Sequence, residues 1–277
     1  RGLVSTSEDF GPQGEQPTHP DLLDWLASRF VASGWSTKWL HRQIVCSAVY
    51  RQSSHVRPEL QDRDPENRLL ARQSSLRLTA EAIRDSSLAA GGLLSRTLGG
   101  PSVRPPQSSS TVMGGFGKSG WSVSGGDARF RRGLYIFIKR ATPFPQLATF
   151  DAPNARDCCT RRERSNTPLQ SLTLLNDPMF FACSKALAMR VLIECDGNDQ
   201  QRMDRLFRIC ISRLPSAQER HELLASYRRL VEVLRRDPRS VAELVADNPG
   251  GGDPIELGAW TGVCSVVLNL HEFITRD

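Results

Sequence analysis

The chain has 277 residues, with 36 Lys or Arg against 30 Asp or Glu and a net charge of +6. Apolar residues make up 39% and charged residues 24%, which is the balance of a globular protein and excludes a disordered chain, a collagen-like fibre or a membrane-spanning bundle. The length is ample for a hydrophobic core, in one large domain or two small ones.

The surplus of positive charge is confined to one segment. Between Ala128 and Arg164 there are nine cations and three anions, so this segment carries +6 and the rest of the chain is neutral. Two interpretations stay open, a site for a bound anion or the positive half of an internal ion-pair network. We expect no nucleic-acid partner, because the aromatic residues of the segment lie in a predicted strand and its arginines follow no single face.

Helix signals dominate the first third of the chain. Thr18-His19-Pro20-Asp21 resembles a capping box with proline in the first turn, which predicts a helix that ends near Gly34. A second helix is predicted from about Thr37. A third begins at Thr79 and ends at Gly91-Gly92.

A long loop and a strand segment are predicted in the middle of the chain. Residues 99–130 are rich in Gly, Ser and Pro, with Trp121 as the one large anchor, and a loop of that length is either disordered or built around a function. Residues 134–138 are β-branched and aromatic, which predicts a strand, and residues 146–150 could form a shorter one. Residues 131–177 therefore constitute an Arg-rich strand and motif segment.

The C-terminal part, residues 178–277, is predicted to be helical. Thr167, Pro168 and Gln170 mark the start of the preceding helix, and Asp177 is placed to cap the next one. A further capping box begins at Ser216, and the apolar residues from 257 to 271 predict a helix central to the core. The predicted fold class is mainly α, a helical domain with a small central β element and a long Gly/Ser/Pro-rich loop.

The highest density of reactive side chains lies between residues 150 and 177. A thiolate among arginines and beside a carboxylate could act as a nucleophile or a ligand, but no histidine lies nearby in sequence to act as a base. The structural alternative is that these residues form internal ion pairs and helix caps. We predict no catalytic residue, and the candidate ligand or anion-binding residues are Asp151, Cys158, Arg161, Arg162, Arg164, Gln170 and Asp177.

The spacing of cysteines and histidines does not match that of a metal site or a covalent haem site. The sequence has seven cysteines but no C-x-x-C and no C-x-x-C-H, so we expect no zinc site and no haem attachment in this chain. Four cysteines lie in apolar helical runs and are predicted to pack in the core: Cys46, Cys183, Cys210 and Cys264. The sequence shows no signal peptide and no membrane-spanning segment.

A set of motifs occurs in order along the chain. They are Gly2-Leu3-Val4, residues 18–27, Asp64-Pro65-Glu66-Asn67-Arg68, residues 80–85, residues 99–103, residues 150–153, residues 161–170, residues 174–177 and residues 268–273. Together they resemble a planctomycete-specific domain of unknown function that lies C-terminal in large exported proteins with cytochrome-c-like regions.

The resemblance implies that residues 1–277 are a single, N-terminally incomplete copy of this domain. It also implies an exported or periplasmic location, upstream domains of the same protein as partners, and haem only in an upstream domain. The leading hypothesis is an accessory binding or interdomain-assembly domain of an exported cytochrome-c-type protein, with anionic polysaccharide as a further possible partner. The alternative is an enzyme that acts on anionic or sulfated carbohydrate through Asp151, Cys158 and the arginines.

Overall fold

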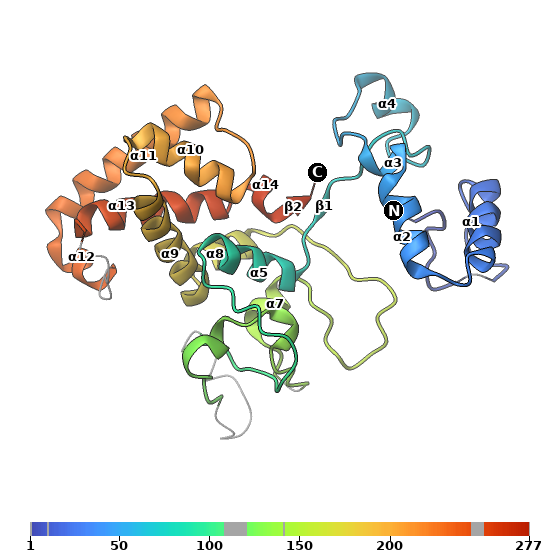
Figure 1. Cartoon of the computed structure of the whole chain (residues 1–277), viewed down its shortest axis with the longest axis horizontal. Helices are drawn as coiled ribbons and strands as arrows, with labels where there is room; N and C mark the ends of the chain where they lie inside the picture. The colour runs from blue at the N-terminus through green and yellow to red at the C-terminus, as the bar shows by residue number, and fades with distance from the viewer. Residues whose placement is uncertain (1, 10, 108–120, 141, 245–251, 277) are drawn as a thin grey trace. The chain divides into compact units, whose positions relative to one another are not determined.

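The computed structural model describes residues 2–9, 11–107, 121–140, 142–244 and 252–276 (Figure 1). The fold class is confirmed: the chain is mainly α. Contacts divide the predicted domain into two compact units. Unit 1 comprises Arg1–Arg77, Cys159–Arg161 and Thr275–Asp277, and unit 2 comprises Leu78–Cys158 and Arg162–Ile274.

Unit 1 contains four helices: α1 (Pro20–Ala32), α2 (Thr37–Cys46), α3 (Ala48–Arg51) and α4 (Pro58–Arg63). The first two are joined by Gly34 and Trp35, which both adopt positive φ as a tight helical hairpin requires. Ser36 caps α2 by accepting a hydrogen bond from the Trp39 N–H at 3.2 Å. None of the four helices contains a buried residue.

The small β element also belongs to unit 1. Strand β1 (Leu76–Arg77) pairs antiparallel with β2 (Thr275–Arg276), so that Leu76 lies opposite Arg276. These two strands are the only sheet in the described part of the chain. The β element therefore joins residues about two hundred positions apart, a pairing that no local signal predicts.

Unit 2 is built around α13 (Pro254–Leu268), which packs against α9 (Pro178–Glu194) and α11 (Ala217–Arg236) (Figure 1). Trp260, Cys264 and Val267 of α13 are fully buried, which confirms the predicted central helix. The other helices of this unit are α5 (Ala80–Ala90), α7 (Pro145–Thr149), α8 (Pro168–Asn176), α10 (Asp199–Cys210), α12 (Pro238–Leu244) and α14 (His271–Ile274). No helix in the described ranges is both long and apolar enough to cross a membrane.

The predicted caps of unit 2 are confirmed. Thr79 accepts from the Ala82 N–H at 3.3 Å, and Asp177 accepts from the Met179 N–H at 2.9 Å. At the start of α11, Ser216 and Glu219 each accept from the other's backbone N–H. At α1, by contrast, the cap is His19 without a side-chain bond, because Thr18 donates to the Leu3 carbonyl instead.

The predicted central strands are wrong in position. Residues 133–135 form a 3₁₀ turn, η2 (Gly133–Tyr135), and Ile136 makes a single bridge to Val103. Residues 145–149 form α7, because Pro145 at its first position favours a helix. The β propensity of residues 134–138 is not realised, since a strand needs a neighbouring strand as well as suitable side chains.

The spacing of Leu169, Leu172 and Leu175 places them on one apolar stripe of α8 and predicts that this stripe is buried, but the structure shows it exposed. Leu169, Leu172 and Leu175 are 61%, 54% and 40% exposed, whereas Gln170 and Leu174 are buried. Burial here is decided by the hydrogen bonds of Gln170 rather than by hydropathy. The prediction that four cysteines pack in the core is confirmed for Cys183 and Cys264, which are buried. Cys210 is half-buried, and Cys46 is exposed.

The long loop is anchored as predicted at Trp121, although residues 108–120 lie outside the described residues. The Trp121 ring stacks on Phe144 with centroids 5.6 Å apart. Its indole N–H donates to the Pro105 carbonyl at 2.6 Å. Stacking thus holds Trp121 against Phe144, and one partly buried hydrogen bond joins Trp121 to the earlier part of the loop at Pro105.

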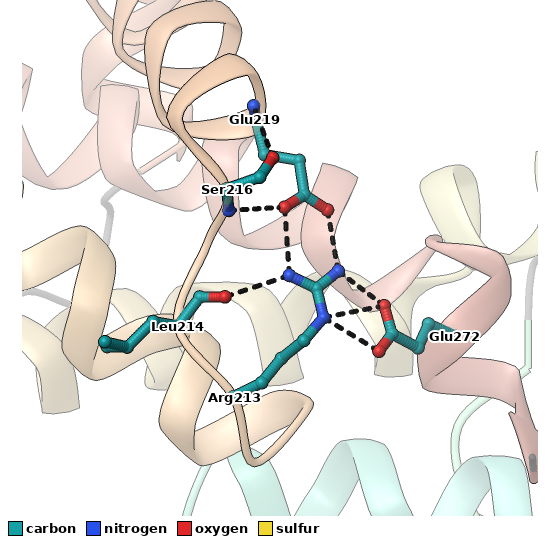
Figure 2. A network of polar contacts seen from close by, with 5 residues as sticks. All are labelled: Arg213, Leu214, Ser216, Glu219 and Glu272. Carbon is teal, nitrogen blue, oxygen red and sulfur yellow. Dashed lines mark hydrogen bonds and ion pairs between the residues drawn. The ribbon is translucent and has the colours of Figure 1, made fainter. Parts of the chain in front are cut away.

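Arg213 ties the start of α11 to α14 (Figure 2). Its guanidinium donates to Glu219 at 2.7 and 2.9 Å and to Glu272 at 2.6 to 3.1 Å. It also donates to the Leu214 carbonyl at 3.0 Å. Hydrogen bonds from Arg213 lower the pKa of Glu219 to about 2.

We expect this network to make the stability of unit 2 decrease at low pH. Because the pKa of Glu219 is depressed in the folded state, its contribution is fully present above the ordinary glutamate pKa and is lost as the pH falls from about 4.5 through about 2. The side chains are partly exposed, so the loss should be only about 1 kcal/mol. Urea unfolding of the wild type and Glu219→Gln at pH 7 and pH 3 measures it. The wild type and Glu219→Gln should differ less in their unfolding free energy at pH 3 than at pH 7. An equal difference in unfolding free energy at both pH values would contradict the prediction.

Candidate functional site

Asp151 and Gln170, two of the predicted site residues, are joined through Ser165. The Asp151 carboxylate accepts from the Ser165 N–H at 2.7 Å and from its hydroxyl at 2.8 and 3.0 Å. It also accepts from the Gln170 amide at 3.4 Å. Both carboxylate oxygens are therefore occupied within the protein.

Gln170 fastens both ends of the exposed loop 152–166. Its side chain is fully buried, and its amide nitrogen donates to the Thr149 carbonyl at 3.0 Å and to the Ser165 hydroxyl at 3.1 Å. Its amide oxygen accepts from the Thr167 N–H at 3.5 Å. Gln170 thus has a structural role, which was the alternative to ligand binding in the sequence analysis.

Asp177 belongs to a separate buried chain of polar contacts. Its carboxylate accepts from the Gln146 amide at 3.1 Å, and Gln146 in turn accepts from Arg84 at 3.1 Å. Burial raises the pKa of Asp177 and lowers the pKa of Arg84. Arg84 is fully buried and also donates to the Arg129 carbonyl at 2.8 Å. Sequence reasoning missed Arg84, although it lies in the motif at residues 80–85.

The remaining predicted residues are exposed. Arg162 forms an ion pair with Glu81 at 2.9 Å. Within the described ranges, the Cys158 and Arg164 side chains make no hydrogen bond or ion pair. Arg161 is grouped with unit 1 and Cys158 with unit 2. The contacts of the described residues thus connect Asp151 with Gln170 and do not join the whole predicted set.

Two other arginines of the basic segment, Arg131 and Arg132, make internal contacts. Arg131 is buried, donates to the Thr97, Gly99 and Pro101 carbonyls and stacks on Tyr135 at 3.7 Å. Arg132 pairs with Asp85 at 3.1 Å. These contacts favour an internal network over a bound-anion site as the reason for the local charge.

A cavity of about 690 Å³ lies within unit 1, where no site was predicted. Its volume falls within the range of small-molecule pockets, about 300 to 1,000 Å³. Apolar residues form most of its wall: Leu3, Leu22, Trp25, Leu26, Ile44, Val49, Tyr50, Leu70 and Leu76. The cavity therefore has the character of a binding site rather than of a catalytic cluster.

The polar wall of this cavity is shaped by the motif at residues 64–68. The buried carboxylate of Asp64 accepts from the Arg68 and Leu69 N–H groups at 2.7 and 2.8 Å, which lowers its pKa. The buried Asn67 amide donates to the Arg72 carbonyl at 2.7 Å and to Ser74 at 3.2 Å. These bonds fix the loop that presents Leu70, Arg72 and Ser74 to the cavity.

Another part of the lining comes from the motifs at residues 2–4 and 18–27. Thr18 donates to the Leu3 carbonyl at 2.9 Å through its N–H, which holds Leu3 beside α1. Trp25 of α1 contacts Trp39 of α2, with ring centroids 6.3 Å apart. The clue in the sequence was that three of the motifs had no assigned role; only the fold shows that they line one cavity.

In the described ranges, no group of three or more His, Cys, Asp or Glu side chains is placed to hold a metal ion. The cavity wall contains amide and hydroxyl groups and one guanidinium. Such groups orient a ligand by hydrogen bonds and charge.

Comparison with known proteins gives one result. A family model described as PSD1, a protein of unknown function (DUF1553), matches residues 1–227. The matched region includes all of the residues that line the cavity. No curated protein and no solved structure matches the chain.

Proposed function

We propose, on the premise that this chain belongs to the PSD1 family of unknown function (DUF1553), that it is an accessory binding and assembly domain. Following the resemblance noted in the sequence, the whole protein is an exported, cytochrome-c-type multidomain protein of planctomycetes. Haem belongs to an upstream domain, and the upstream domains are the partners of this chain. Unit 1 is its binding module.

One observation carries this proposal: α1 to α4 contain no buried residue, although they are rich in large apolar side chains. Val31, Trp35 and Val45 are 50%, 66% and 45% exposed and lie outside the wall of the cavity. Burying exposed apolar side chains of this size against a partner is favourable, which supports an interaction role for unit 1. We call Val31, Trp35 and Val45 the outer apolar residues.

The reactive groups of the motif segment support a non-catalytic role. Asp151 is engaged by Ser165 and Gln170, and Asp177 caps a helix. The alternative, an enzyme for anionic or sulfated carbohydrate, would need Asp151 free beside Cys158 and the arginines. No contact among the described residues favours that arrangement.

The proposal predicts that Val31→Asp and Val45→Asp weaken binding of this chain to the upstream domains of its own protein. Truncating a core contact of an interface costs about 1 to 2 kcal/mol, so the double variant should bind at least about tenfold more weakly in calorimetry. Its unfolding free energy should change by less than about 0.5 kcal/mol, because both side chains are exposed.

The matched control is Ile193→Asp, a 70% exposed residue of α9 in unit 2. This variant should bind the upstream domains like the wild type. Equal binding by the double variant and the wild type would contradict the assembly role of unit 1. Binding of a sulfated glycan that is lost in Arg164→Ala would instead favour the carbohydrate alternative.

A further inference from the structure

We propose that the cavity of unit 1 binds a free, single-chain amphiphile with an anionic head group. This inference rests on the proposed function only in treating unit 1 as a binding module. The apolar tail would lie against Leu22, Trp25 and Ile44, and the head group would face Arg72.

The charge of the wall selects the sign of the head group. Among the described residues that line the cavity, Arg72 is the only charged one, and none of them is a carboxylate. A second guanidinium lies close by, since Arg276 stacks over the ring of Tyr50, another wall residue, at 5.0 Å. An anion is therefore favoured and a cation disfavoured at this end of the cavity.

The guanidinium of Arg72 is held in place before any ligand arrives. Its two terminal nitrogens donate to the Pro65 carbonyl at 2.9 Å and the Asp64 carbonyl at 3.4 Å, and both residues belong to the loop fixed by Asp64 and Asn67. The nearby Asp64 carboxylate also interacts with this charge, but its two oxygens accept from the Arg68 and Leu69 N–H groups. The guanidinium donors that the two carbonyls do not use can meet an incoming carboxylate or sulfate. Gln43, Gln73 and Ser74 add neutral hydrogen-bonding groups to the same wall.

The apolar part of the wall explains why the ligand needs a tail. Leu22, Trp25 and Ile44 are all more than a third exposed, so a tail that covers them removes apolar surface from water. A small inorganic anion would gain nothing from these side chains. The combination of one cation with an apolar wall is thus matched by an amphiphile rather than by an anion alone.

The test uses the whole chain and three probes of equal tail length, namely decanoate, decanol and decyltrimethylammonium, each below its micelle concentration in calorimetry. Decanoate should bind saturably and at least about tenfold more tightly than decyltrimethylammonium. Arg72→Met should lose about tenfold in affinity for decanoate while its affinity for decanol changes by less than about twofold. Arg72→Lys, which keeps the charge, should retain most of the decanoate affinity.

Neighbouring residues supply the controls. Leu22→Glu places a carboxylate in the wall and should weaken decanoate binding, whereas Leu23→Glu changes a comparably exposed residue of the same helix outside the wall and should not. Arg68→Met, next to the cavity loop but not in the wall, should bind like the wild type.

The inference is overturned if wild-type protein shows no saturable decanoate binding, if the cationic probe binds equally well, or if Leu22→Glu and Leu23→Glu behave alike. Binding to phosphatidylglycerol vesicles without binding to monomeric decanoate would also overturn it. These results concern the ligand of the cavity only. The proposed function is retained in each case if the double variant Val31→Asp, Val45→Asp still binds the upstream domains more weakly than the wild type.

The opposite result rejects the proposed function and retains the inference about the cavity. In that result, the wild type does not bind the upstream domains, while the double variant still binds decanoate.

Discussion

Replacement of Arg84 by alanine is expected to lower the unfolding free energy of unit 2 by about 3 kcal/mol. Arg84 is fully buried, and it bonds both the Gln146 amide and the Arg129 carbonyl. Alanine would leave these partners unsatisfied and a cavity in place of the side chain. Urea unfolding followed by circular dichroism measures the change.

Two further variants separate the causes. Arg84→Met keeps most of the volume but removes the donors, so it should recover only the part of the loss that comes from the cavity. Arg132→Ala removes an exposed arginine that pairs with Asp85, and it should cost less than about 1 kcal/mol. A loss in Arg84→Ala no greater than that in Arg132→Ala would show that the buried chain of contacts is not important for stability.

Replacement of Gln170 by leucine is expected to cost about 2 to 3 kcal/mol and to loosen the loop 152–166. Leucine has a similar volume, so the loss should come from the unsatisfied Thr149 carbonyl and Ser165 hydroxyl. The loop contains Arg156, Arg161, Arg162 and Arg164, which makes trypsin a direct probe of its opening. Cleavage in the loop should be at least about tenfold faster in the variant, because local opening costs less.

Asn176→Ala is the matched control, since Asn176 is an exposed amide of the same helix that donates to the Leu172 carbonyl at 2.8 Å. It should change stability by about 0.5 kcal/mol or less and leave the rate of cleavage unaltered. Unchanged cleavage in Gln170→Leu would mean that Asp151 and Ser165 hold the loop by themselves. In that case Gln170 would not be needed to hold the loop closed.

The predicted site illustrates what charge and residue type can and cannot show. The density of Asp, Cys and Arg between residues 150 and 177 predicted candidate ligand-binding residues there, and the structure shows hydrogen bonds within the protein for Asp151, Gln170 and Asp177. Whether those contacts are internal or face a ligand depends on partners far away in sequence. Arg162 meets Glu81, and Arg131 meets the carbonyls of residues 97–101. The cavity in unit 1 could not be predicted, because its lining is mostly apolar and comes from segments that are far apart in the sequence.

The sequence by itself determined several of the long helices and where they begin. Thr79, Asp177 and Ser216 cap helices through hydrogen bonds to residues two or three positions away. The local sequence is therefore enough to predict these helix starts. Tertiary structure alone decided which face of α8 is buried, where the two short strands pair, and why the basic segment is basic. Each of these depends on contacts across tens or hundreds of residues, such as Arg84 with Arg129 and Leu76 with Arg276. Part of the +6 therefore belongs to arginines that hold the fold together, namely Arg131, Arg132 and Arg162, because a buried or paired guanidinium is satisfied only where the folded chain brings an acceptor to it.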